Sequence, residues 1–287
     1  MPRGLDHIVH AVHDLDAAGA LYRRLGFTVG ARNKHPWGTH NRIVQFPGVF
    51  IELLAVGEPA LIPPPRQQVF SFGAFTRDFL ARHEGLAMLV LEGKGAPDAQ
   101  AFRAAGVGDY ELFDFAREGE RPDGSAVKVA FSLAFATDTL APDAGFFTCQ
   151  HHYPENFWNP AFQQHANAVG SVAGVVFVAE NPADHHVFFK AFAGASDLQS
   201  TSTGITVETP RGTIQVMEPS AYARHFDVAP PDVTRGMRFA AVRFAVRDRA
   251  AAQVALAASG AGAVTHLGRL VVAAQAAHGA TLVFEGA

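Results

Sequence analysis

The chain has 287 residues and a formal net charge of −4, and 17% of its residues are charged. At about 100–200 residues per domain this length indicates two domains, and the acidic balance disfavours a general nucleic-acid binder, which normally carries a basic surface. The sequence lacks the roughly 18 consecutive apolar residues of a membrane-spanning helix and the apolar core of a signal peptide. Its single cysteine, Cys149, excludes an intramolecular disulfide. We therefore expect a cytoplasmic protein with no nucleic-acid and no membrane partner.

The N-terminal segment predicts a strand followed by a helix. Residues 5–12 are mostly apolar and are typical of a β-strand, and Asp14 or Asp16 stands where a helix N-cap is expected. Apolar residues then recur at helical spacing as far as Leu25, and Gly26 lies where a glycine commonly ends a helix. Gly26 follows His7 by 19 positions.

The same pattern recurs three more times along the chain. Its strand-like runs, each with the glycine that ends the following helix, are 86–92 with Gly106, 172–179 with Gly194, and 239–246 with Gly260. In the second and fourth copies the glycine again lies 19 positions beyond the residue that corresponds to His7, and the helix of the third copy is two residues longer. Further strand-like runs follow each helix, so the repeating unit is predicted to be strand–helix–strand–strand–strand.

One such unit is too small to cover both faces of its own sheet, so the units must pair. We therefore predict an α+β fold in which four βαβββ units form two incomplete eight-stranded barrels. The predicted domains are residues 1–168, which contain a cleft, and residues 169–287, which form a scaffold without ligands.

Segments outside the repeat are also patterned. The connector at residues 58–68 contains three consecutive prolines, which exclude a helix there. Residues 70–83 carry phenylalanines at helical spacing and predict an additional helix. A Pro-Asp-Gly sequence predicts a hairpin turn at residues 121–124.

Alternate residues of the first and fourth strands of each unit line the interior of such a barrel. In the first unit this places His7 and Glu52 on the inner face. Both residue types are unusual in otherwise apolar strands, because a buried carboxylate requires a partner or a bound cation. An imidazole and a carboxylate on adjacent inward positions provide two of the three ligands of a facial metal site. A histidine packed at the edge of the core is the simpler alternative for His7.

Several motifs resemble the vicinal oxygen chelate superfamily, and in particular its glyoxalase-like branch. They are DHIV at residues 6–9, GTHN at 38–41, FIEL at 50–53, FFTCQHH at 146–152, PENFW at 154–158 and HAN at 165–167. The resemblance implies paired βαβββ units and a divalent metal, held by side chains on the strands and open to two oxygen atoms of a substrate. Activities in the superfamily include isomerisation, epimerisation, extradiol ring cleavage and antibiotic sequestration.

The sequence departs from this family where a second metal-binding histidine is common. The corresponding residues are Ala87, Ala173 and Ala241, and the fourth-strand counterparts of Glu52 in the third and fourth units are Gln215 and Phe284. The third ligand in the first half would come from the fourth strand of the second unit, where Cys149 and His151 share one face. We favour His151 for a cation that also binds water and substrate oxygens, whereas Cys149 would suit zinc.

Other candidate residues surround the predicted cleft. Trp37, His40, Asn41 and Arg42 are expected at its mouth as substrate-binding residues. His165 and Asn167 are also expected to bind substrate by bracing the cleft, or else to cap the approach to the third copy. Either Glu52 or Glu155 would be the base for proton transfer.

These features lead to two hypotheses. The first is a metal-dependent lyase, isomerase or dioxygenase that acts on a small molecule through Zn²⁺, Fe²⁺, Mn²⁺ or Ni²⁺ bound by His7, Glu52 and His151. The second is a metal-free protein of the bleomycin-resistance type that binds a small molecule within phenylalanine-rich walls. Exposed sheet edges in such units also make a homodimer an expectation.

Overall fold

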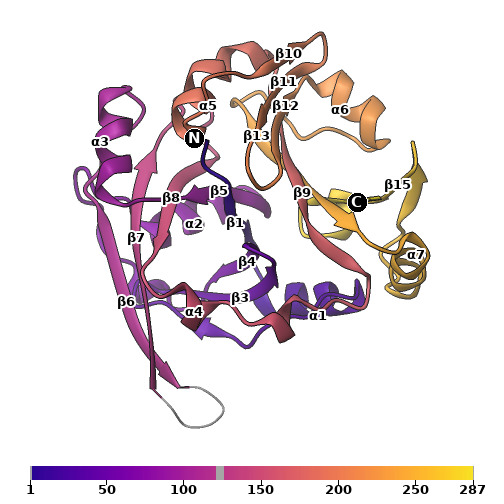
Figure 1. Ribbon diagram of the computed structural model, residues 1–287, viewed down its shortest axis with the longest axis horizontal. Coiled ribbons are helices and arrows are strands. Elements are labelled where there is room, and N and C mark those ends of the chain that lie inside the picture. The colour runs from indigo at the N-terminus through magenta and orange to yellow at the C-terminus, as the bar shows by residue number, and fades with distance from the viewer. Residues whose placement is uncertain (1, 121–125, 287) are drawn as a thin grey trace.

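A computed structural model describes residues 2–120 and 126–286 of the chain. It contains two eight-stranded sheets, with the strand orders β2-β3-β4-β1-β5-β8-β7-β6 and β10-β11-β12-β9-β13-β16-β15-β14. Figure 1 shows the two sheets next to each other, the first from indigo to magenta and the second towards yellow. The predicted α+β fold of four βαβββ units, paired into two incomplete barrels, is confirmed.

The first sheet is built from the first two units. The first unit consists of β1 (Leu5–Ala11), α1 (Leu15–Arg24), β2 (Asn33–Lys34), β3 (Thr39–Phe46) and β4 (Val49–Val56). The second unit consists of β5 (Gly85–Glu92), α3 (Ala96–Ala104), β6 (Phe113–Glu120), β7 (Ala126–Ala136) and β8 (Gly145–His151). The predicted extra helix between these units is α2 (Phe72–Leu80).

The second sheet repeats this arrangement. The third unit consists of β9 (Val169–Val178), α5 (His186–Ala193), β10 (Gln199–Thr201), β11 (Gly204–Glu208) and β12 (Thr213–Met217). The fourth unit consists of β13 (Arg238–Val246), α7 (Arg249–Ala258), β14 (Val264–His266), β15 (Arg269–Val272) and β16 (Thr281–Gly286). Between them lies α6 (Pro219–Phe226), which the sequence analysis did not predict.

The two units of each half meet through their first strands. β1 pairs antiparallel with β5, and β13 pairs antiparallel with β9. Within a unit the first strand also pairs in parallel with the fourth, as β1 does with β4. First and fourth strands therefore occupy the middle of each sheet, and their inward side chains meet at the base of each concave face.

The same local signals begin and end the repeated helices. Asp14 caps α1 by accepting hydrogen bonds from the backbone N–H groups of Asp16 and Ala17, and Asp248 caps α7 in the same way. Gly26 and Gly260, which follow these helices, have positive φ angles of 90° and 72°. Glycine adopts this conformation without the steric cost that a Cβ atom would add, which explains the constant spacing in the sequence.

Some segments differ from the prediction. The helix expected in the third copy, before Gly194, is divided into a 3₁₀ turn, Pro182–His185, and the α-helix α5. The proline-rich connector contains a 3₁₀ turn, Pro59–Leu61. Short helical turns, α4 (Pro154–Phe157) and Pro160–Gln163, follow β8, and another, Ala274–Ala276, precedes β16. The hairpin turn predicted at residues 121–124 lies outside the described residues.

One apolar core joins the two halves. Phe146 of β8 is fully buried, and its ring lies 4.7 Å from that of Phe188 and 5.7 Å from that of Phe177 in the second half. Phe27 similarly packs against Phe244, with ring centroids 5.1 Å apart. Burial of such large side chains is the main source of stability for a fold of this kind.

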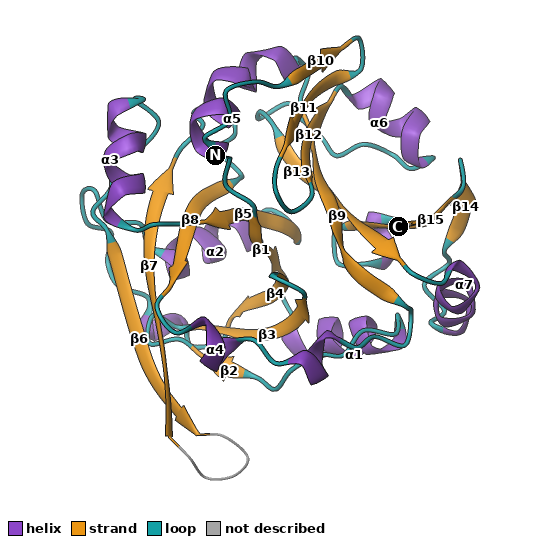
Figure 2. Ribbon diagram, in the orientation of Figure 1, coloured by secondary structure: helices purple, strands orange, loops and turns teal. Residues whose placement is uncertain are grey.

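The concave face of each sheet forms a smaller core with its own helix. Phe79 and Leu80 of α2 pack on the first sheet, whereas Tyr222 and Phe226 of α6 pack on the second. Figure 2 shows that other helices, such as α3, α5 and α7, lie at the periphery of the molecule. Within the described residues, no helix is long and apolar enough to cross a membrane.

Candidate functional site

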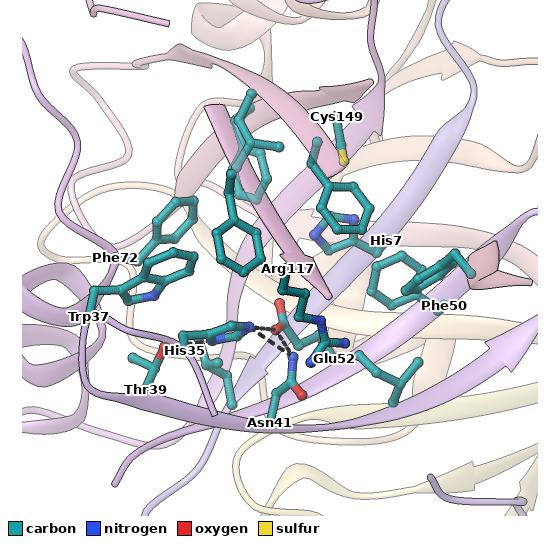
Figure 3. Close-up of a pocket in the computed structure, with 17 residues that line it drawn as sticks. His7, His35, Trp37, Thr39, Asn41, Phe50, Glu52, Phe72, Arg117 and Cys149 are labelled. Atoms are coloured by element: carbon teal, nitrogen blue, oxygen red, sulfur yellow. Dashed lines mark hydrogen bonds and ion pairs between the residues drawn. The ribbon is translucent and has the colours of Figure 1, made fainter. Parts of the chain in front are cut away.

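The concave face of the first sheet contains a pocket (Figure 3). We call it the aromatic pocket, because many of its walls are aromatic side chains: Trp37, Phe50, Phe72, Phe115, Phe131, Phe147 and Phe157. Its polar lining consists of His7, His35, Thr39, Asn41, Glu52, Arg117 and Cys149. Apolar walls with a few polar groups are typical of a site for a small organic molecule.

Three strands in the middle of the sheet bring His7, Glu52 and Cys149 to this pocket. In the parallel pairing of β1 with β4, His7 lies opposite Phe50, and Glu52 lies opposite Val9. His7 and Glu52 are therefore two positions apart along adjacent strands and face the same side. Cys149 reaches the pocket from β8. Glu52 and His7 thus share one face of the sheet, whereas their roles as ligands remain predictions.

Glu52 is held by side chains from the edge of the sheet. Asn41 Nδ2 donates a hydrogen bond to Glu52 Oε1 over 2.5 Å, and His35 Nε2 lies 3.9 Å from the same oxygen (Figure 3). Burial lowers the pKa of His35 and outweighs the opposing attraction of Glu52. Glu52 Oε2 has no hydrogen-bond partner within the described residues, so this oxygen is available to a ligand.

Arg117 of β6 adds a positive charge to the same end of the pocket. Its Nη1 donates to Asn33 Oδ1 of β2 over 3.2 Å, which connects the two edge strands of the first sheet. Burial lowers the pKa of Arg117, and the negative charge of Glu52 opposes this shift. The side chains of the two sheet edges thus meet at this end of the pocket.

His7 is fixed by aromatic packing and by a carboxylate. Its ring stacks on Phe50 with the centroids 4.3 Å apart and an interplanar angle of 12°, and Phe147 packs against it edge-on at 5.5 Å. His7 Nδ1 lies 2.5 Å from Oδ1 of the adjacent Asp6. These contacts leave little freedom for the imidazole to rotate.

His151 lies away from the aromatic pocket. It lines a neighbouring polar pocket whose walls are formed by Asp6, Gly48, Glu92, Gly93, Cys149, Gln150, His151, Pro154, Trp158 and Arg211. His151 Nε2 lies 3.0 Å from Asp6 Oδ2. Burial raises the pKa of Asp6, but the hydrogen bonds from His151 and His7 outweigh this effect and lower the pKa below its ordinary value.

Cys149 lines both pockets and lies close to His7. Potential ligand atoms of Asp6, His7 and Cys149 all fall within 4.8 Å of one another, and all three residues are buried. Burial, together with the negative charges of Asp6 and Glu52, raises the pKa of the Cys149 thiol well above its ordinary value.

The other residues predicted from the sequence are distributed over several places. Trp37 and Asn41 line the aromatic pocket. His40 faces outside it and pairs with Glu58 at 3.0 Å, and Arg42 pairs with Asp16 at 2.7 Å. These last two side chains are engaged on the far side of β3, because successive residues of a strand face opposite sides.

The remaining predicted residues lie between the halves or at the surface. His165 bonds to the backbone carbonyl of Gln45 over 2.9 Å, and Asn167 donates to the carbonyl of Leu25 over 2.8 Å. Both therefore brace the connection between the two halves. Glu155 is exposed on α4 and lines neither of the two pockets described above.

Sequence reasoning missed His35, Arg117 and the role of Asp6. The alternation of Phe113, Phe115 and Arg117 along β6 was a signal that these side chains share one face. His35 lies in the turn between β2 and β3, where periodicity gives no direction. Its place in the pocket depends on how far the sheet curls.

Comparison with family models supports the interpretation of the fold. A model described as a glyoxalase-like domain matches residues 5–192, which is more than half of the chain. The chain belongs to this glyoxalase-like family. The resemblance to the vicinal oxygen chelate superfamily that the motifs indicated is confirmed. A search of curated proteins found no match.

Solved structures share the architecture of this glyoxalase-like chain at low sequence identity. A hypothetical protein from Staphylococcus aureus has a TM-score of 0.68 and 13% identity, with 99% of each chain covered. A mutant of 4-hydroxymandelate synthase from Streptomyces coelicolor has a TM-score of 0.59 and 14% identity, with 100% of this chain and 94% of the other covered. A fusion protein that contains a 4-hydroxyphenylpyruvate dioxygenase has a TM-score of 0.50 and 14% identity, with 92% and 39% covered. These likenesses establish the fold.

Proposed function

We propose that the aromatic pocket is the active site of a metal-dependent, glyoxalase-like enzyme that acts on a small molecule with neighbouring oxygen atoms and a largely apolar body. The observation that carries the proposal is the convergence of His7, Glu52 and Cys149 on one pocket from β1, β4 and β8. The family match and the fold of the dioxygenase and synthase structures support the enzyme class.

The donor groups fit a divalent metal bound beside His7. Ligand atoms of Asp6, His7 and Cys149 lie within 4.8 Å of one another, whereas Glu52 lies outside this group. Glu52 lines the same pocket, and its Oε2 has no hydrogen-bond partner among the described residues. One imidazole, one carboxylate and one thiolate suit zinc, whereas Fe²⁺, Mn²⁺ and Ni²⁺ would rely more on His7 and Glu52. We therefore propose Cys149 as the third ligand instead of His151, since Cys149 lines the aromatic pocket together with His7 and His151 does not. When bound, the metal would polarise the oxygen atoms of the substrate as a Lewis acid.

The protein side chains supply binding and proton transfer. The aromatic walls would bind the apolar body of the substrate and keep water out, which strengthens electrostatic interactions within the pocket. Asn41 fixes one oxygen of Glu52. If Glu52 stays outside the metal's ligand set, its other oxygen would accept a proton from a substrate carbon and return it. Proton transfer out and back through one carboxylate is chemistry of the isomerase or lyase type. Glu52 is the better candidate base, because Glu155 lines neither pocket.

Metal content of the protein purified without a histidine tag tests this proposal. We expect about one zinc or other divalent ion per chain, lost in His7→Ala, reduced in Glu52→Gln and Cys149→Ser, and retained in His151→Gln. A wild-type protein that binds no divalent metal in solution would refute the metal-dependent function. Loss of metal in His151→Gln with retention in Cys149→Ser would instead restore His151 as the ligand.

A metal-free binding protein is the second candidate, and the many aromatic side chains of the pocket favour it. Such a protein would bind an aromatic compound with the same affinity in the presence and absence of a chelator. A metal-dependent enzyme would lose much of its affinity for an oxygen-chelating ligand when the chelator is added. Calorimetry with and without EDTA separates these outcomes.

The cytoplasmic location and the homodimer remain predictions. Val264 of the edge strand β14 and Leu267, which follows that strand, are exposed apolar side chains that a second copy would cover. Light scattering would show twice the chain mass of 30.6 kDa for a dimer. A mass equal to one chain would exclude the homodimer.

A further inference from the structure

Asp6 is a buried carboxylate between the two pockets, and the proposed reaction does not use it. It is only 3% exposed and lies on β1 directly before His7. His7 opens to the aromatic pocket, whereas Asp6 and His151 line the polar pocket. A buried carboxylate is costly unless hydrogen bonds or charges compensate it, so its surroundings indicate what it does.

On one side, Asp6 determines which nitrogen of His7 carries a proton. The distance of 2.5 Å between Asp6 Oδ1 and His7 Nδ1 requires a hydrogen bond, and an ionised carboxylate can only accept one. In the neutral imidazole the proton therefore lies on Nδ1, and Nε2 carries the lone pair that a metal or a substrate proton needs. Stacking on Phe50 fixes the plane of the same ring.

On the other side, His151 contacts the second oxygen of Asp6. Its Nε2 lies 3.0 Å from Asp6 Oδ2, and its ring stacks on Trp158 with centroids 5.8 Å apart and an interplanar angle of 19°. Phe131 and Phe157 contact the His151 ring edge-on at 4.9 and 5.1 Å. Each oxygen of Asp6 thus faces a ring nitrogen that packing holds in place.

We propose that His151 and Asp6 form a positioning pair that holds His7 in the tautomer with Nε2 free toward the aromatic pocket. Asp6 acts through His7 and is not itself a metal ligand, because both of its oxygens face imidazole nitrogens. This inference rests on the proposed role of His7, but the tautomer of His7 can be measured without metal or substrate. Partners of this kind orient metal-binding histidines, and their loss typically weakens metal binding by about 10–100-fold.

The test uses the full chain and two readouts. Long-range ¹⁵N–¹H NMR correlations report the tautomer of His7 in the metal-free protein, and a Zn²⁺ titration reports affinity. The variants are Asp6→Asn, His151→Leu, which removes the donor, and His151→Gln, whose amide can replace it. His13→Gln is the matched control, since His13 is an exposed residue in the turn between β1 and α1.

We expect the Nδ1–H tautomer in the wild type, a change of tautomer in Asp6→Asn, and a loss of about 10–100-fold in Zn²⁺ affinity. His151→Leu should weaken Zn²⁺ binding by a smaller factor, whereas His151→Gln and His13→Gln should match the wild type. Equal affinities for His151→Leu and His151→Gln would overturn the role of His151, even if Asp6→Asn failed to fold.

The outcomes also separate the two proposals. An Nε2–H tautomer of His7 in the wild-type protein would overturn the role of Asp6, whatever the metal affinity. A wild type that binds no Zn²⁺ but shows the Nδ1–H tautomer, lost in Asp6→Asn, would refute the metal-dependent function and support the positioning of His7. An unchanged tautomer and affinity in Asp6→Asn would refute the positioning pair alone.

Discussion

The two halves of the molecule share one fold but differ in what their concave faces contain. The first face carries the aromatic pocket, with His7 and Glu52 in adjacent strands. In the second, Arg243 donates to Glu285 over 2.6 Å and to Gln215 over 2.7 Å, and Arg269 pairs with Glu285 at 3.1 Å. The charged groups of the second face therefore satisfy one another, whereas the first face leaves an oxygen of Glu52 available to a ligand.

The strand register shows which positions of the repeated unit differ between the two halves. Val9 lies five residues before the helix cap Asp14 and pairs with Glu52, and Arg243 lies five residues before Asp248 and pairs with Val283. Val283 rather than Phe284 is therefore the counterpart of Glu52, and Phe284 belongs to the core shared by both halves. The comparison teaches that the framework is repeated, while the inward residues decide which half has a candidate site.

The largest expected effect is on the core that joins the halves. Replacing Phe146 with alanine should lower the free energy of unfolding by about 3–5 kcal/mol, because a fully buried ring is lost and a cavity remains. Urea unfolding measures the effect, with Phe146→Leu as a milder control. A loss below about 1 kcal/mol, or two separate transitions in the wild type, would show that the halves are energetically independent.

The stability that His10 contributes to the contact between the halves should also depend on pH. His10 is fully buried, bonding to Tyr22 and to the carbonyl of His278, and burial lowers its pKa to about 4. The folded state therefore binds this proton less readily than the unfolded state, whose histidine has the ordinary value of about 6.5. Stability from neutral His10 should be complete above about pH 6.5 and fall by about 3 kcal/mol towards pH 4.

Denaturation across this pH range, compared with His10→Gln, measures the contribution. The variant keeps a donor and an acceptor but does not titrate, so its stability should fall less between pH 6.5 and 4. Parallel curves for the two proteins would mean that His10 does not carry the pH dependence.

Replacing a glutamate with glutamine in each of the two concave faces should have opposite consequences for stability and for metal binding. Glu285→Gln should lower the free energy of unfolding by about 1–2 kcal/mol, since it leaves two partly exposed arginines without their carboxylate, and should leave metal binding unchanged. Glu52→Gln should cost less than about 1 kcal/mol but impair metal binding. Thermal unfolding and a Zn²⁺ titration of both variants test this expectation. Loss of Zn²⁺ binding in Glu285→Gln, with normal binding in Glu52→Gln, would place the metal site in the second half.

The smallest expected effect concerns the helix caps, which sharpen the idea of a repeated framework. Asp14→Ala and Asp248→Ala should each lower stability by about 1 kcal/mol, because each removes the acceptor of two backbone hydrogen bonds at a helix start. Urea unfolding of both variants should give similar losses. A difference above about 1 kcal/mol would show that the two caps are not equivalent.

The repeated framework could be predicted from the sequence because its signals are local. Asp14, Gly26 and their counterparts set the start and end of each helix, and strand alternation placed His7 and Glu52 on one face. Arg117 and His35 could not be placed in this way, since the curl of the sheet brings its edges together. The pairing of Asp6 with His151 depends on three adjacent strands, β1, β5 and β8, which are distant in sequence.

Anomalous X-ray diffraction at the zinc edge, from crystals grown with Zn²⁺, tests the central claim most directly. The account predicts one strong peak in the first half, within bonding distance of His7 Nε2 and beside Cys149 and Glu52, with none at Arg243 and Glu285. A peak in the second half, or density in the first half that lies away from His7, would contradict it.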